Sequence, residues 1–180
     1  ARVEEHRNLG VAFYKTGMLD EAVREFRRVV ELRPDDLGAR FHLGLSYLRL
    51  GKWSDAFTEF DAASRQRGAK AAVFLDLALA QERLGRLDDA RASLEEALVR
   101  GGEGEARVHL SLGILAIRLG QFGEADGHFM HARPLFGEKA PVERAHGPRA
   151  LQTAGRARHL ELLNPLETDT AEPVPSGQGV

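Results

Sequence analysis

The chain has 180 residues, of which 43% are hydrophobic and 29% charged, and it contains no apolar run long enough to cross a bilayer. Its formal net charge of -2 gives no excess of positive charge, so we expect neither nucleic-acid binding nor direct membrane insertion. Because cysteine is absent, disulfides, thiolate nucleophiles and cysteine-ligated zinc are excluded.

The compartment stays open from the sequence. The first residue is Ala1, with no initiating methionine and no signal-like apolar segment behind it. A soluble, cytoplasmic protein is favoured, and a periplasmic one requires that an upstream signal was removed. Lysine supplies only four of the 25 basic residues, and such an excess of arginine is typical of a GC-rich, bacterial genome.

Helical apolar spacing recurs along the chain and is broken by one glycine in each unit. The first unit reads LGVAFYKTGMLDEAVREF (9–26), and the later ones read LGLSYLRLGKWSDAFTEF (43–60), LALAQERLGRLDDARASL (77–94) and LGILAIRLGQFGEADGHF (112–129). Gly17, Gly51, Gly85 and Gly120 are therefore 34, 34 and 35 residues apart, a period typical of stacked helical arrays. Each unit is predicted to be two helices joined at its glycine, because glycine weakens a helix interior.

The second helix of each unit is predicted to start three residues after the glycine. Asp20, Ser54 and Asp88 stand there in three units, and their side chains can accept a hydrogen bond from a free N–H of the first turn. Small and large apolar residues then alternate, as in Ala22 and Phe26, which lets the paired helices approach closely.

These residues resemble the tetratricopeptide repeat, which places Leu-Gly, an aromatic, a turn glycine, Ala, Phe, Ala and Pro over 34 residues. Unit three departs from it with Ala78 for the first glycine and Gln81 for the aromatic, and unit four has Ala116 for the aromatic. The resemblance implies an all-α, right-handed superhelical solenoid of antiparallel helix pairs that binds other proteins. The first two units match at Leu9, Gly10, Phe13, Gly17, Ala22, Phe26 and Pro34, and at Leu43, Gly44, Tyr47, Gly51, Ala56, Phe60 and Ala63.

The predicted organisation follows this repeat and ends in two further segments. Solenoids need a polar terminal face to remain soluble, and the helical pattern after the fourth unit can supply one. The last residues contain three prolines and too few apolar side chains to fold alone. We expect repeats at 3–36, 37–70, 71–105 and 106–139, a capping helix region at 140–163 and a flexible tail at 164–180.

No group of residues in the sequence has the pattern of a catalytic or metal site. His128 and His131 can share one helix face, but no further ligands stand nearby, so a solvated helix surface is the favoured interpretation. Asp88 and Asp89 stand at a helix start, where negative charge suits the helix dipole. We predict that the chain is not an enzyme and has no catalytic residues, metal or cofactor.

An apolar stripe on the first helix of the later units exceeds what the packing of paired helices needs. In the tetratricopeptide family these positions line the concave face, so the resemblance implies a groove for a partner, with internal packing as the alternative. A shared exposed apolar surface of this kind marks a binding site. The predicted groove residues are Phe41, Leu45, Leu48, Leu75, Leu79, Leu110, Ile114 and Ile117.

One cation recurs beside this stripe in every unit, and we name these four residues the rim. A solvated edge and the recognition of acidic residues are both open for it. The rim residues are Lys15, Arg49, Arg83 and Arg118. Some family members hold a C-terminal carboxylate with Lys, Asn and Arg, but that clamp is absent here, because its positions are filled by Arg7, Val11, His42, Ala72 and Asp76.

The predicted function is that of an adaptor or scaffold. Its partner would be a protein or peptide segment, apolar or amphipathic with acidic flanks, that lies in the concave groove. One alternative is a self-assembling scaffold, either head-to-tail or with the chain's own residues 160–169 (LELLNPLETD) in a groove. The other is a regulatory or targeting module of a larger protein.

Overall fold

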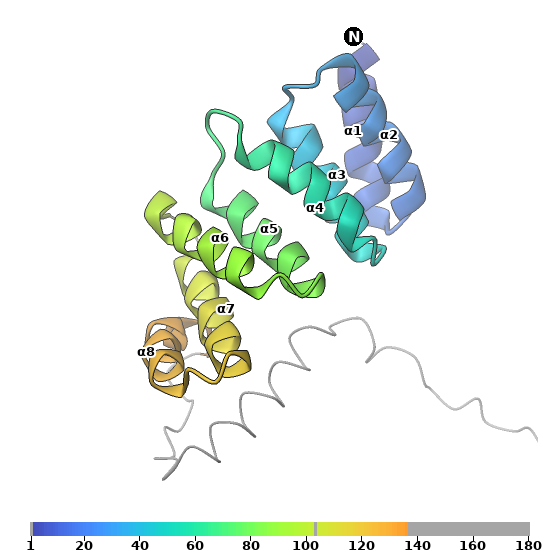
Figure 1. Cartoon of the computed structure of the whole chain (residues 1–180). Helices are drawn as coiled ribbons and strands as arrows, with labels where there is room; N and C mark the ends of the chain where they lie inside the picture. The colour runs from blue at the N-terminus through green and yellow to red at the C-terminus, as the bar shows by residue number, and fades with distance from the viewer. Residues whose placement is uncertain (1, 103, 137–180) are drawn as a thin grey trace, which may run out of the picture.

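The computed structural model describes residues 2–102 and 104–136, which form a stack of α-helices without strands (Figure 1). Consecutive helices run antiparallel and pack in pairs, which gives the predicted right-handed superhelical solenoid. The capping region 140–163, the tail 164–180 and the segment 160–169 lie outside the described residues. The helices are α1 (Arg2–Thr16), α2 (Leu19–Leu32), α3 (Leu37–Arg49), α4 (Trp53–Ser64), α5 (Ala71–Arg83), α6 (Leu87–Arg100), α7 (Glu105–Arg118), α8 (Phe122–Ala132) and the 3-10 helix η1 (Arg133–Phe136).

The glycine turns end the first helix of each pair. At the end of α3 the N–H of Gly51 donates to the carbonyl of Leu48 at 3.0 Å, and the N–H of Lys52 donates to that of Tyr47 at 2.9 Å. This pair of bonds satisfies the last carbonyls of the helix, and it needs a residue with positive φ after the C-cap. Gly51 has a φ of 71°, which costs glycine little because it has no Cβ.

The predicted N-caps are wrong. The N-caps of α2, α4 and α6 stand two residues earlier than expected, at Met18, Lys52 and Arg86, so Asp20, Ser54 and Asp88 lie inside the first turn. The residues at the N-cap positions make no side-chain capping bond. The glycine turn is short, so the next helix starts directly after it. Asp20 and Asp88 lie in the first turn of their helices, where their negative charge interacts favourably with the helix dipole.

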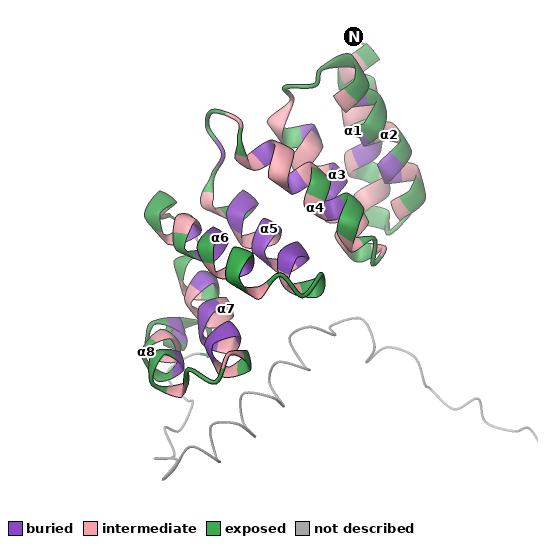
Figure 2. Ribbon diagram, viewed as in Figure 1, coloured by how far each residue is buried: buried purple, intermediate pink, exposed green. Residues whose placement is uncertain are grey.

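Buried residues lie along the facing sides of the paired helices (Figure 2). The rings of Phe26 and Phe60 are fully buried, and each lies against a glycine of the preceding helix. A Cβ built on Gly44 would come within 2.6 Å of the Phe60 ring. This close approach explains the Leu-Gly of the repeat, because any larger side chain would push the helices apart.

Three apolar clusters join neighbouring pairs into one stack. The first includes Phe26 of α2 and Leu43 of α3, the second Phe60 of α4 and Leu77 of α5, and the third spans α5, α6 and α7. The first helices of successive pairs also contact one another, α1 with α3 and α3 with α5, so they line the inner side of the curved stack.

Candidate functional site

A cavity of about 180 Å³ lies between α5 and α7. Its apolar lining includes Leu75 and Leu79 from α5 and Leu110 and Ile114 from α7. All four are predicted groove residues, and each is half-buried. Their spacing of four residues on each helix places them on one face, so two neighbouring repeats contribute to a single surface.

The other predicted groove residues have different surroundings. Phe41, Leu45 and Leu48 on α3 are half-buried and pack against the cluster around Phe60 and Leu77, as the internal-packing alternative expects. Ile117 is also half-buried, and it is not part of the cavity lining. The α3 part of the apolar stripe therefore contributes to the join between repeats, whereas its α5 and α7 parts line the cavity, and Leu75 also packs against the cluster that includes Leu94.

The cavity also has a polar lining that the groove prediction missed. Asp76, Glu82, Arg107 and Ser111 all contribute to it. Burial raises the pKa of Asp76 to about 6, and the nearby Arg107 opposes this rise. The sequence signal for Asp76 was its place in the carboxylate clamp of related repeats, where the expected charge is positive.

The rim arginines contact the preceding repeat. The guanidinium of Arg49 lies 4.9 Å from the ring centre of Tyr14, and that of Arg83 lies 5.1 Å from the ring centre of Trp53. Arg118 forms an ion pair with Glu82. All three arginines remain exposed, as does Lys15, which belongs to the first repeat and has no repeat before it in the described chain. The recurring arginine therefore has a structural role, because in each of these three repeats it contacts a residue of the preceding repeat.

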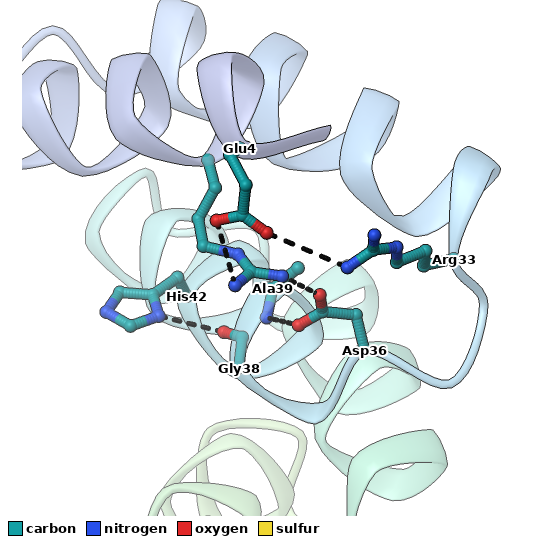
Figure 3. A network of polar contacts seen from close by, with 7 residues as sticks. Glu4, Arg33, Asp36, Gly38, Ala39 and His42 are labelled. Carbon is teal, nitrogen blue, oxygen red and sulfur yellow. Dashed lines mark hydrogen bonds and ion pairs between the residues drawn. The ribbon is translucent and has the colours of Figure 1, made fainter. Parts of the chain in front are cut away.

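Ion pairs connect the first repeat to the second near the start of α3 (Figure 3). Asp36 caps α3 by accepting a hydrogen bond from the N–H of Ala39 at 2.9 Å, and it also pairs with Arg7 of α1. Glu4 lies 3.3 Å from Arg7 and 3.7 Å from Arg33. Arg7 stands at one of the positions of the carboxylate clamp of related repeats. Because Glu4 and Asp36 both pair with it, it is not an unpaired cation that could bind a partner's carboxylate.

Three histidines meet between α7 and α8. The Nδ1 atoms of His109 and His128 are 3.0 Å apart, and the rings of His109 and His131 stack at 4.7 Å. Burial is the main cause that lowers the pKa of His109 and of His128, and the neighbouring histidines lower it further. The predicted solvated surface is therefore correct for His131, which is exposed, but His128 is half-buried in a helix contact.

Within the described ranges, no group of three or more His, Cys, Asp or Glu side chains is arranged to hold a metal ion. None of the helices described is long and apolar enough to cross a membrane.

Paired helices, a continuous curved stack and an apolar cavity on its inner side define a helical-repeat scaffold for protein interaction. The family model of the tetratricopeptide repeat matches residues 7–72 and 75–125. The chain belongs to the tetratricopeptide repeat family, as its resemblance indicated. The comparison with curated proteins found no match.

Solved structures named MamA have the same fold. A MamA structure from AMB-1 is 31% identical over 82% of this chain and 79% of that one, with a TM-score of 0.66. MamA from Desulfovibrio magneticus RS-1, from residue 41 onward, is 23% identical over 77% of each chain, with a TM-score of 0.69. A further MamA structure covers 96% of this chain and 98% of its own at 16% identity, with a TM-score of 0.70. The last two likenesses are informative about the fold alone.

Proposed function

We propose that the chain is a non-enzymatic adaptor that binds an apolar or amphipathic segment of a partner protein across α5 and α7. The observation that carries the proposal is the cavity itself, where six apolar side chains from α5, α6 and α7 line one volume. Such a surface gains free energy when an apolar side chain enters it and displaces water. A helix or an extended peptide can supply that side chain.

The rim arginines favour a partner segment that carries acidic residues beside its apolar part. Arg49 and Arg83 lie over aromatic rings, and their guanidinium groups remain exposed. The exposed N–H donors of these guanidinium groups can still bind acidic residues on either side of an apolar segment, which is the recognition role considered for the rim from the sequence. Charges at such an edge act chiefly on orientation and on the association rate.

The replacement Leu79→Glu tests the groove. It places a charge at the cavity wall, and we expect it to weaken partner binding at least about tenfold because the charge must be desolvated on binding. Val99→Glu is the matched control, since Val99 is 79% exposed on α6 and does not line the cavity. Circular dichroism melts of both variants establish that each remains folded.

The binding measurement is a cross-linked pull-down from cell extract with the wild-type chain and the two variants. A partner kept by wild type and Val99→Glu but lost from folded Leu79→Glu supports the groove. Retention of every partner by Leu79→Glu contradicts it. Recovery of the chain alone points to the self-assembling scaffold instead.

A further inference from the structure

A carboxylate stands inside the apolar cavity between α5 and α7. Asp76 contributes to the same lining as Leu75, Leu79, Leu110 and Ile114. It has no hydrogen bond or ion pair with another residue in the described part of the chain. Since burial disfavours its charged form, an ionised Asp76 gains from any donor that reaches it.

The other charges around the cavity are already compensated or solvated. Glu82 forms an ion pair with Arg118, so its carboxylate has a partner. Arg107 also belongs to the lining, but it is exposed and forms no ion pair with Asp76, and its charge does not offset the effect of burial on the pKa of Asp76. Arg83 lies over Trp53. Among the described residues of this lining, Asp76 is therefore the carboxylate with neither a hydrogen bond nor an ion pair, and Arg107 acts on it only through its charge.

We propose that Asp76 selects partner segments in which a lysine or arginine stands beside the apolar residue that enters the cavity. The apolar side chain fills the space between Leu79 and Ile114, and the ammonium or guanidinium group donates a hydrogen bond to the Asp76 carboxylate. This inference rests on the proposed function of the groove. A charge-assisted hydrogen bond in a partly desolvated site favours such a partner, and it penalises one that presents a carboxylate at the same place.

The test is selection of random 12-residue peptides displayed on phage, with the full 180-residue chain as bait. The baits are wild type, Asp76→Asn, Arg107→Gln and Leu79→Glu, the last as the groove control. We expect wild type to enrich peptides with a basic residue next to an apolar one. Asp76→Asn should keep the apolar preference and lose the basic one, and Arg107→Gln should keep both because it leaves Asp76 in place.

A selected peptide is then synthesised with its basic residue intact or replaced by glutamine, and binding is measured by fluorescence anisotropy. The replacement should weaken binding to wild type on the order of tenfold and leave binding to Asp76→Asn unchanged. Acidification from pH 7.5 to pH 5 should weaken the basic peptide on wild type and not on Asp76→Asn, since a protonated Asp76 no longer carries the charge.

The outcomes separate the two proposals. If wild type selects apolar peptides without basic residues, or if Asp76→Asn selects the same basic peptides, the role of Asp76 is refuted and the groove stands. If wild type selects nothing that Leu79→Glu fails to select, the groove itself is refuted, and the role of Asp76 with it.

Discussion

At the residue scale, the contact between a glycine of one helix and an aromatic of the next sets how closely each pair can pack. Gly44 lies against Phe60, and Gly113 lies against Phe129. The third repeat has Ala78 and Leu94 instead, both buried in the same cluster. The added methyl group and the smaller opposing side chain offset each other in volume, so the departure from the repeat is a paired change.

This pairing predicts a coupling between two substitutions in the third repeat. Leu94→Phe alone should destabilise the fold by about 1–3 kcal/mol, because the ring meets the methyl group of Ala78. Adding Ala78→Gly should recover part of that loss, giving a coupling of at least about 0.5 kcal/mol in a double-mutant cycle. Urea denaturation followed by circular dichroism measures each free energy of unfolding.

Strict additivity of the two changes would contradict the paired packing. The matched comparison is Gly44→Ala in the second repeat, where the ring of Phe60 cannot move away easily because it is fully buried. That substitution should destabilise by a similar amount, about 1–3 kcal/mol.

Sequence reasoning located the turn glycines and the packing glycines, because each of these positions has a local backbone or steric requirement. It misplaced Asp20, Ser54 and Asp88 as caps, since a two-residue shift of a helix start leaves the apolar spacing unchanged. It also did not place Asp76 in the cavity. Which side of α5 faces a neighbouring repeat depends on how the repeats are oriented, and no single residue type encodes that.

At the element scale, the contact between α8 and α7 contains two histidines, His109 and His128, whose protonated forms are disfavoured by burial and by the neighbouring histidines. The pKa values of His109 and His128 lie below the usual value of 6.5. As pH falls through that value, the unfolded chain binds protons more readily than the folded one, so the stability of the fold decreases. Glu105 and Glu124 raise the two pKa values but do not offset the burial.

We therefore expect acid to lower the melting temperature through the contact between α7 and α8. The measurement compares thermal unfolding at pH 7.5 and pH 5, where a chain of this size loses about 2–4 °C for each kcal/mol. The parent protein carries Asp76→Asn, and the two further substitutions His109→Asn and His128→Asn should reduce the fall in melting temperature on acidification. An equal loss in both would contradict a role for these histidines.

The parent for this experiment is Asp76→Asn. The raised pKa of Asp76 has the opposite effect, because the folded state disfavours its charge and stability falls as pH rises from about 4 to about 6. Removing that carboxyl group takes away its opposing effect, so the contribution of His109 and His128 can be measured. The sequence suggested the pair His128 and His131 from their spacing, but His109 is distant along the chain and only the packing of the helices brings it near.

At the scale of the whole molecule, the first repeat differs from the others because one of its sides has no described neighbour. Leu9 occupies the position of Leu43, Leu77 and Leu112 in the later repeats. Leu9 is 48% exposed, whereas the three others are at most 5% exposed. The same residue type in the same place therefore contributes differently to stability, according to whether another repeat covers it.

The substitutions Leu43→Ala and Leu9→Ala should reveal this difference. Leu43→Ala should cost about 2–5 kcal/mol, because it leaves a cavity between two repeats. Leu9→Ala should cost less than about 1 kcal/mol, as is usual for an exposed site. Chemical denaturation measures both, and similar losses would mean that Leu9 is covered in solution, for example by a second copy of the chain.

The period of the sequence predicted the order of the elements and the solenoid, because each unit repeats the same local packing. It could not show that the apolar stripe would be divided between a core and a cavity. Leu45 and Leu79 stand in equivalent positions, yet Leu45 packs against the cluster around Phe60 and Leu79 borders the cavity. That difference depends on how neighbouring repeats lie against each other, which is not a property of any one unit.

The contacts that arginine side chains make between neighbouring repeats also affect how easily the stack bends. A cation keeps its attraction to an aromatic ring over distances up to about 6 Å, so the Arg49–Tyr14 and Arg83–Trp53 contacts tolerate sliding. Ion pairs are present at two of the junctions, Arg7–Asp36 between the first and second repeats and Arg118–Glu82 between the third and fourth, and the carboxylates of both pairs are only 11% exposed. Within the described residues no ion pair joins the second repeat to the third, so the solenoid should bend most easily at that junction and resist bending more at the junction that holds the cavity.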